Sequence, residues 1–184
     1  GQASTWAEYG EDMGVLAGDA LMIYAFEVAA KAFKEVSDAD DLKRVGRAIE
    51  ILASKTGIYG MIGGQTVDVE LAGGPIPKNK LDFIYRLKTG ALIEASMLIG
   101  AVLGGAAEED CKIVESLAGK VGLAFQIQDD ILDVTSTSEA LGKPVLSDEK
   151  NQKTTYVTLV GLEQAKKNVE EISARAVSLL KELP

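Results

Sequence analysis

The sequence predicts an all-α fold built from long, closely packed helices. Apolar residues recur at intervals of three and four, whereas alternating patterns and runs of β-branched residues are rare. Several periodic segments are apolar nearly all round and rich in Ala and Gly, which is typical of helices inside a bundle. Because the chain has 184 residues and no linker or internal repeat, we expect a single domain over residues 1–184.

Helical periodicity covers five segments of the chain. They are residues 11–34, 40–57, 80–103, 108–134 and 162–183, and the second pattern continues through residue 71. Ser37 or Asp38 offers an N-cap for the second helix. Gly73 and Gly74, followed by two nearby prolines, predict a helix stop and a turn. Residues 135–153 mix Ser, Thr, Gly, Pro and charged residues, and a loop of this length favours a lid or a binding loop.

Charge and composition exclude several classes of function. The chain has 19 basic and 28 acidic residues, and its basic residues are scattered, which argues against nucleic-acid binding. The net charge of −9 repels anionic substrates unless divalent cations and local lysines invert the field at one site. The chain contains no His, the commonest general base and zinc ligand.

Compartment is indicated by two weak signals. Cys111, the single cysteine, cannot form an internal disulfide and fits a reducing compartment. The most apolar stretch, residues 95–107, is shorter than the roughly 20 residues that span a bilayer. We therefore expect a cytoplasmic protein with no signal peptide and no membrane span.

The most informative segment is residues 125–133, in which Asp129, Asp130 and Asp133 stand among apolar residues. In a helix, Asp129 and Asp133 lie one turn apart on one face, with Asp130 beside them. Carboxylates among apolar neighbours are costly to keep ionised, and Mg²⁺ binds one or two carboxylates together with substrate phosphates. The segment predicts a magnesium site for a phosphorylated ligand, and a solvated acidic helix face is the alternative.

Further blocks of sequence accompany the aspartates. They are Gly10-Glu11-Asp12, Leu16-Ala17-Gly18-Asp19-Ala20-Leu21, Gly63-Gly64-Gln65 with Asp68, Lys88-Thr89-Gly90-Ala91-Leu92, Leu141-Gly142-Lys143 and Lys153-Thr154-Thr155-Tyr156. With these blocks the whole chain resembles the trans-isoprenyl diphosphate synthases, the polyprenyl synthetase family. It is most similar to the short-chain farnesyl and geranylgeranyl diphosphate synthases of bacteria. One aspartate motif alone would be a weak signal, but this series of blocks in order is a strong one.

The resemblance implies a bundle of long helices around a deep central cavity, and a homodimer. It also implies a prenyltransferase of isoprenoid biosynthesis that joins isopentenyl diphosphate to an allylic diphosphate such as dimethylallyl or geranyl diphosphate. Mg²⁺ is the implied cofactor, and Mn²⁺ is the alternative ion.

The resemblance also assigns roles to individual residues. The assigned residues are Asp129 and Asp133 as metal ligands, with Asp130 supporting them; Lys88, Lys143 and Lys153 on the diphosphate; Thr89 and Gln126 along the reacting carbons; and Gln65 and Asp68 in the cavity wall. Lys88, Thr89, Gln126 and Asp129 are the expected catalytic residues. The ring of Phe125 would add a cation–π contact to the allylic cation.

Other interpretations stay open. Lys88 and Lys143 also fit ordinary solvated lysines, and Gln65 and Asp68 also fit hydrogen bonding to neighbouring helices. A class I terpene cyclase, a non-catalytic subunit of a prenyl synthase and a helical metal-binding protein without an organic substrate are the alternative functions. The lysine blocks favour a synthase with two substrates.

The family's first aspartate-rich motif is absent, and residues 1–5 resemble the end of that block. We therefore expect the chain to be an internal portion of a synthase, incomplete at both ends and unable to condense substrates by itself. Prenyl transfer by the 184-residue chain, measured with Mg²⁺ and labelled isopentenyl diphosphate, would contradict this expectation. Product chain length depends in this family on residues upstream of that motif, so it cannot be read here.

Overall fold

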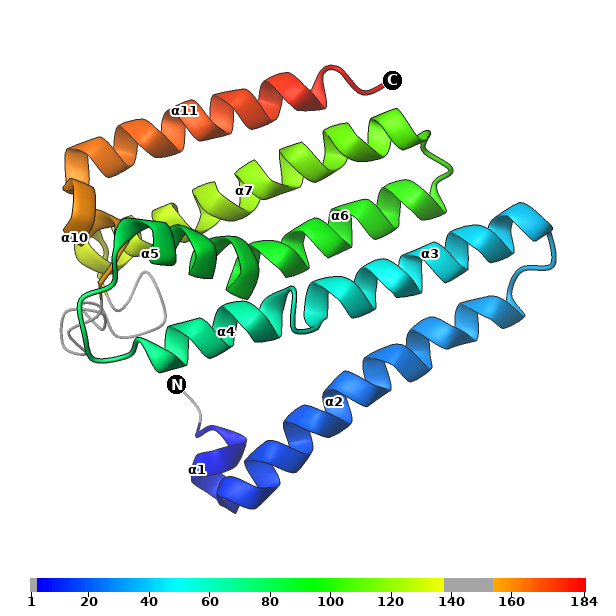
Figure 1. Ribbon diagram of the computed structural model, residues 1–184, viewed down its shortest axis with the longest axis horizontal. Helices are drawn as coiled ribbons and strands as arrows, with labels where there is room; N and C mark the ends of the chain where they lie inside the picture. The colour runs from blue at the N-terminus through cyan, green and yellow to red at the C-terminus, as the bar shows by residue number, and fades with distance from the viewer. Residues whose placement is uncertain (1–2, 138–153) are drawn as a thin grey trace. The chain divides into compact units, whose positions relative to one another are not determined.

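The computed structural model describes residues 3–137 and 154–184, and every regular element in these ranges is a helix (Figure 1). This confirms the all-α fold predicted from the spacing of the apolar residues. The chain divides into two compact units, Gly1–Ile49 and Glu50–Pro184. The single domain expected over residues 1–184 stays a prediction.

The smaller unit contains α1 (Thr5–Tyr9), α2 (Glu11–Lys31), the 3₁₀ turn η1 (Ala32–Lys34) and the first part of α3 (Ala39–Thr56). Ser4 caps α1, because its Oγ accepts a hydrogen bond from the N–H of Ala7 at 3.2 Å. Gly10, with φ at +90°, makes the sharp turn from α1 to α2. The helix predicted over residues 11–34 is confirmed. The periodicity missed α1 because five residues are too few to show a period.

α2 exposes apolar side chains in the smaller unit, where Leu21, Ile23 and Tyr24 are 70%, 71% and 55% exposed. By length and hydropathy, Glu11–Lys34 is the one helix of the described residues that could cross a membrane. The expectation of no membrane span was based on residues 95–107 and did not take this helix into account. Its evidence for a span is weak, since a core helix of a soluble protein passes the same test.

The larger unit continues α3 and contains α4 (Met61–Glu70), α5 (Lys78–Ile84), the π-helical turn η2 (Tyr85–Gly90), α6 (Ala91–Leu103), α7 (Glu108–Thr135), α10 (Tyr156–Val160) and α11 (Leu162–Leu180). α6 and α11 both pack on α7, and the three helices run side by side (Figure 1). η2 packs against α4 and against α7. α7, which carries the aspartate segment, is therefore the central element of this unit.

Two apolar clusters fill the larger unit. The first joins α5, η2, α7, α10 and α11, and its largest fully buried side chains are Leu81, Ile84 and Ile127. The second joins α6 to α7 and includes Leu98 and the free, buried Cys111. Full burial of an aliphatic side chain contributes about 1.5–3 kcal/mol, so these clusters fix how α5, α6 and α7 pack.

Two glycines allow neighbouring helices to approach η2 closely. A Cβ atom at Gly64 of α4 would lie 2.3 Å from the backbone N of Lys88. A Cβ atom at Gly122 of α7 would lie 2.8 Å from the Cα of Gly90. A side chain at either position would overpack the contact, so glycine holds the backbone of η2 tightly between α4 and α7.

Two of the predicted helices are interrupted. A single helix was expected over residues 80–103, but the π turn Tyr85–Gly90 separates α5 from α6. Such turns are rare and frequently occur at functional sites. The second helix, predicted over residues 40–57, is confirmed as α3, but its pattern is interrupted before α4, where a Cβ atom at Gly60 would lie 2.0 Å from the carbonyl O of Lys55. The chain therefore turns at this glycine instead of continuing as a helix to residue 71.

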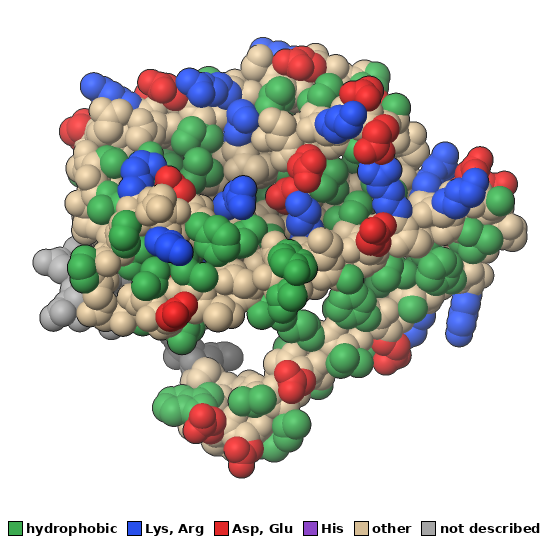
Figure 2. Space-filling view, in the orientation of Figure 1, with side chains coloured by type: hydrophobic (Ala, Val, Ile, Leu, Met, Phe, Trp, Pro, Cys, Tyr) green, Lys and Arg blue, Asp and Glu red, His purple; other side chains and the backbone are tan. Residues whose placement is uncertain are grey.

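The remaining helix predictions agree with the structure. α7 and α11 match the segments expected over residues 108–134 and 162–183. α10 is too short for periodicity to reveal, and it is held by a capping box in which Thr155 and Thr158 bond each other's backbone N–H. Figure 2 shows Lys and Arg side chains interspersed with Asp and Glu over the larger unit, in agreement with the scattered charges of the sequence.

Candidate functional site

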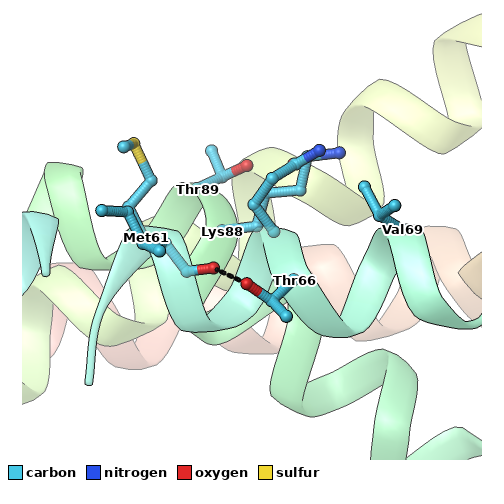
Figure 3. A pocket seen from close by; sticks show the side chains of 7 residues that line it. Met61, Thr66, Val69, Lys88 and Thr89 are labelled. Carbon is cyan, nitrogen blue, oxygen red and sulfur yellow. Dashed lines mark hydrogen bonds between the residues drawn. The ribbon is translucent and has the colours of Figure 1, made fainter. Parts of the chain in front are cut away.

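The candidate site begins with a cavity of about 650 Å³ between α4 and η2. Its lining residues are Met61, Ile62, Gln65, Thr66, Val69, Lys88 and Thr89. Figure 3 shows Lys88 and Thr89 beside Met61, Thr66 and Val69 of α4. Thr66 contributes its methyl group, because its Oγ1 already donates to the carbonyl O of Ile62 at 2.8 Å. The cavity therefore has an apolar wall with one ammonium, one amide and one available hydroxyl group.

Lys88 is paired with a partly buried acid at the edge of this cavity. Its Nζ lies 2.5 Å from Oδ2 of Asp68, and the two side chains are 33% and 15% exposed. Asp68 also lines an adjoining hollow of about 230 Å³ that shares Val69 with the first. The structure thus brings four predicted residues together: Gln65, Asp68, Lys88 and Thr89.

The three aspartates of α7 have different environments. Asp129 is half-buried, whereas Asp130 and Asp133 are 8% and 5% exposed. Oδ2 of Asp130 accepts hydrogen bonds from Oη of Tyr85 at 2.5 Å and from the backbone N of Tyr156 at 2.7 Å. Neighbouring helical residues point about 100° apart, so Asp130 turns away from Asp129 and toward Tyr85 of η2 and the start of α10.

The donor set of α7 fits a magnesium ion held by two carboxylates. Within residues 3–137 and 154–184, no three acidic, Cys or His side chains are grouped closely enough to hold a metal ion. Asp129 and Asp133 are one helical turn apart, and Mg²⁺ commonly uses only one or two carboxylates, with waters and substrate phosphates completing its shell. These two residues therefore suit a metal that is shared with a phosphorylated ligand.

Four predicted residues lie away from the cavity lining or outside the described ranges. Gln126 is half-buried in α7 and is absent from the cavity lining. Phe125 is 56% exposed and lines a separate groove between α7 and α11, so the structure does not bring it to the lysine and threonine of η2. Lys143 and Lys153 lie outside the described residues, and their roles stay predictions.

Sequence reasoning missed Tyr85 and Tyr156, which bond the second aspartate. Both tyrosines are buried in the first apolar cluster, and in the sequence Tyr85 stands in a periodic apolar pattern that marks it only as a core residue. Tyr85 is 45 residues from Asp130 along the chain, and no local spacing relates the two. A buried tyrosine needs a partner for its hydroxyl group, and this was the only available signal.

A second polar cluster in the larger unit includes Glu94 and Glu115, which line a different cavity of about 650 Å³ whose lining contains none of the predicted site residues. Lys55 of α3 forms ion pairs with Glu94 of α6 and Glu115 of α7. Burial raises the pKa of Glu94, and its bond to Lys55 opposes that shift. Burial lowers the pKa of Lys55, but the hydrogen bonds to the two glutamates outweigh it and hold the pKa above the usual value.

A sequence model of one family, described as polyprenyl synthetase, matches residues 1–182 of the chain. The chain belongs to the polyprenyl synthetase family. This confirms the resemblance drawn from the aspartate, lysine and glycine blocks, and it agrees with the all-helical fold.

Named relatives in this family are prenyl diphosphate synthases. The chain is 41% identical over 178 residues to the farnesyl diphosphate synthase of Escherichia coli, covering 96% of this chain and 58% of the relative. It is 45% identical over 163 residues to the geranylgeranyl diphosphate synthase of Cyanophora paradoxa, covering 88% of this chain and 53% of the relative. The chain thus spans only somewhat more than half the length of these curated relatives.

Solved structures show the same fold. A geranyltransferase from Helicobacter pylori, complexed with magnesium and isoprenyl diphosphate, superposes with a TM-score of 0.82 at 34% identity. The match covers 96% of this chain and 56% of that protein. The arrangement of α3 to α11 described above is therefore that of isoprenyl synthases.

Proposed function

We propose that the protein containing these residues is a prenyl diphosphate synthase, which joins isopentenyl diphosphate to an allylic diphosphate such as dimethylallyl or geranyl diphosphate. The observation that carries the proposal is the cavity between α4 and η2, where Lys88 and Thr89 stand at an apolar wall. An ammonium group beside apolar side chains suits a ligand with a diphosphate head and a hydrocarbon tail. Membership of the polyprenyl synthetase family supports the same substrate class.

Several residues of the cavity, together with Gln126 of α7, have roles that follow from this chemistry. Lys88 balances the negative charge that develops on a departing diphosphate, which is the main electrostatic demand of the reaction. The hydroxyl oxygen of Thr89 and the amide oxygen of Gln126 are the proposed neighbours of the allylic cation. Met61 and Val69 exclude the water that would otherwise capture that cation.

We propose Asp129 and Asp133 as the residues that hold Mg²⁺, or Mn²⁺ in its place. Their carboxylate oxygens are the donors that these hard cations prefer. When bound, the ion neutralises diphosphate charge and so makes the diphosphate a better leaving group. Binding of the same diphosphate by Lys143 and Lys153 is part of the proposal.

A prenyl-transfer assay of the full-length protein tests this function. The reaction contains Mg²⁺, radiolabelled isopentenyl diphosphate and either dimethylallyl or geranyl diphosphate. We expect a labelled product longer than the allylic substrate, and we expect Asp129→Asn and Asp133→Asn to form much less of it at the same Mg²⁺ concentration. Hydrocarbon made from the allylic diphosphate alone, without label, would instead identify a terpene cyclase. If neither product is formed, a non-catalytic subunit becomes the better assignment.

We also propose that two copies of the protein form a homodimer in the cytoplasm. The apolar side chains that α2 exposes support the dimer, since large apolar side chains gathered on an exposed helix mark an interaction site. Sedimentation of the full-length protein tests the dimer. Ile23 of α2 is 71% exposed, and the substitution Ile23→Glu should weaken the dimer. A protein that sediments as a monomer would contradict the proposal.

A further inference from the structure

Asp130 connects three helical elements through one oxygen atom. Its Oδ2 accepts from Oη of Tyr85 in η2 and from the backbone N of Tyr156 in α10, at 2.5 and 2.7 Å. Asp130 itself lies in α7 and is 8% exposed. A buried carboxylate is costly unless hydrogen bonds compensate for lost hydration, and here a phenol and a peptide N–H provide them.

The bond to Asp130 satisfies the backbone N–H of Tyr156. Tyr156 is the first residue of α10, and the first N–H groups of a helix have no partner within the helix. Thr155 caps the N–H of Thr158 but not that of Tyr156. Asp130 supplies the missing acceptor, so α10 and α7 are joined at a fixed point.

Tyr156 extends the connection to α11 and α5. Its Oη accepts from Nδ2 of Asn168 at 2.8 Å, and Oδ1 of Asn168 accepts from Nε2 of Gln164 at 2.8 Å. Nζ of Lys78 lies 5.5 Å from the centre of the Tyr156 ring, a cation–π distance. Tyr156, whose backbone N–H is bonded to Asp130, is thus held through its side chain by two further elements.

The bond to Tyr85 acts on the turn that carries the cavity residues. Tyr85 is the first residue of the π turn, and Lys88 and Thr89 follow within the same turn. Fixing the Tyr85 side chain against α7 therefore fixes where the turn begins. The close approach of Gly90 to Gly122 fixes the other end of the turn against the same helix.

We infer that Asp130 is a positioning residue and not a metal ligand: through Tyr85 it holds the π turn that presents Lys88 and Thr89 to the substrate, and through Tyr156 it fixes α10 against α7. This inference rests on the proposed prenyl-transfer function and gives the second aspartate of the segment a role distinct from that of Asp129 and Asp133. Displacement of a reacting group by about 1 Å can cost about 100-fold in rate, so loss of this anchor should appear in kcat.

The test compares Asp129→Asn, Asp130→Asn and Tyr85→Phe in the full-length protein, with Tyr59→Phe as the control because Tyr59 is 83% exposed. The measurements are kcat, KM and the Mg²⁺ concentration that gives half the maximal rate. We expect Asp130→Asn and Tyr85→Phe to lower kcat about 10- to 100-fold while the Mg²⁺ requirement stays unchanged. Asp129→Asn should raise the Mg²⁺ requirement, and Tyr59→Phe should change nothing.

Hydrogen exchange of residues 85–90 gives a readout that needs neither metal nor turnover. Exchange should become faster in Asp130→Asn and Tyr85→Phe and remain unchanged in Asp129→Asn. Tyr85→Phe removes one oxygen atom only, so it serves if Asp130→Asn does not fold.

Three outcomes separate the possibilities. A raised Mg²⁺ requirement in Asp130→Asn would make Asp130 a metal ligand and overturn the inference. Normal kcat and normal exchange in Tyr85→Phe would also overturn it, because the bond would then hold nothing in place. Absence of prenyl transfer in the unmodified protein would instead refute the proposed function, whereas the exchange data would still decide whether Asp130 holds the turn.

Discussion

Gly122 of α7 lies directly against Gly90 of η2, so that a Cβ atom added at Gly122 would be 2.8 Å from the Cα of Gly90. This contact sets the distance between two parts of the candidate site. α7 carries Asp129 and Asp133, and η2 carries Lys88 and Thr89. The absence of two side chains thus controls how closely the proposed metal ligands and the diphosphate lysine approach each other.

We expect Gly122→Ala to lower the free energy of unfolding by about 1–3 kcal/mol, because the new methyl group overpacks the contact with Gly90. Gly119→Ala, in the same helix, is the matched control, since its added Cβ atom would have nothing within 4 Å. The control should raise the free energy of unfolding by about 0.5–1 kcal/mol, as alanine does inside a helix. Urea denaturation measures both, and similar values for the two variants would contradict the tight contact.

Substitution of Lys88 by Met should lower kcat/KM for the allylic diphosphate by about 100-fold or more, since one charge that stabilises the leaving diphosphate is lost. The shape of the side chain is largely kept. Lys112→Met is the control, because Lys112 is an exposed lysine of α7 whose Nζ pairs with Glu109 at 3.0 Å. Steady-state kinetics on the full-length protein tests this, and an equal loss in both variants would make Lys88 an ordinary surface lysine.

Thr155→Ala should destabilise the protein by about 0.5–2 kcal/mol, because the capping box of α10 is lost. The side-chain oxygen of Thr155 accepts from the N–H of Thr158 at 3.2 Å, and the side chain is buried. Thr155→Ser keeps the hydroxyl group and should retain most of the stability. Thermal unfolding of the two variants compares them, and equal melting temperatures would show that the cap contributes nothing.

The ion pairs of Lys55 should make stability fall in alkaline solution. The pKa of Lys55 is above its usual value of 10.5, because the bonds to Glu94 and Glu115 outweigh burial. The folded protein thus holds this proton more tightly than the unfolded chain. The stability that the ion pairs contribute is therefore complete below the usual pKa of lysine and is lost as the pH rises through the pKa of Lys55 in the folded protein. When denaturation is measured between about pH 9 and 12, the free energy of unfolding of Lys55→Met should fall less than that of the unmodified protein.

Lys112→Met is again the control for this alkaline fall, because Lys112 is exposed and lies outside the Lys55 cluster. The free energy of unfolding of the control should fall with rising pH as steeply as that of the unmodified protein. If the free energy of unfolding of Lys55→Met falls equally steeply, the ion pairs of Lys55 do not contribute to stability.

Much of the fold follows from local patterns in the sequence. The spacing of apolar residues correctly predicts α2, α7 and α11, because a helix buries residues three and four apart. The breaks at Gly60 and at the π turn could not be predicted. The turn at Gly60 depends on a close approach to the carbonyl O of Lys55, and the π turn is held by close approaches from Gly64 and Gly122 of other helices. A single glycine in the sequence reveals neither kind of approach.

The same division applies to the candidate site. The sequence specifies a pair of carboxylates one turn apart, Asp129 and Asp133, and the blocks that identify the family, since both depend on residues near one another in the chain. Packing between helices specifies the pairing of Lys88 with Asp68 and of Asp130 with Tyr85. It also places Phe125 in a different groove, between α7 and α11. These contacts join residues that are distant in sequence, and their geometry depends on how the helices fit together, which no short-range spacing encodes.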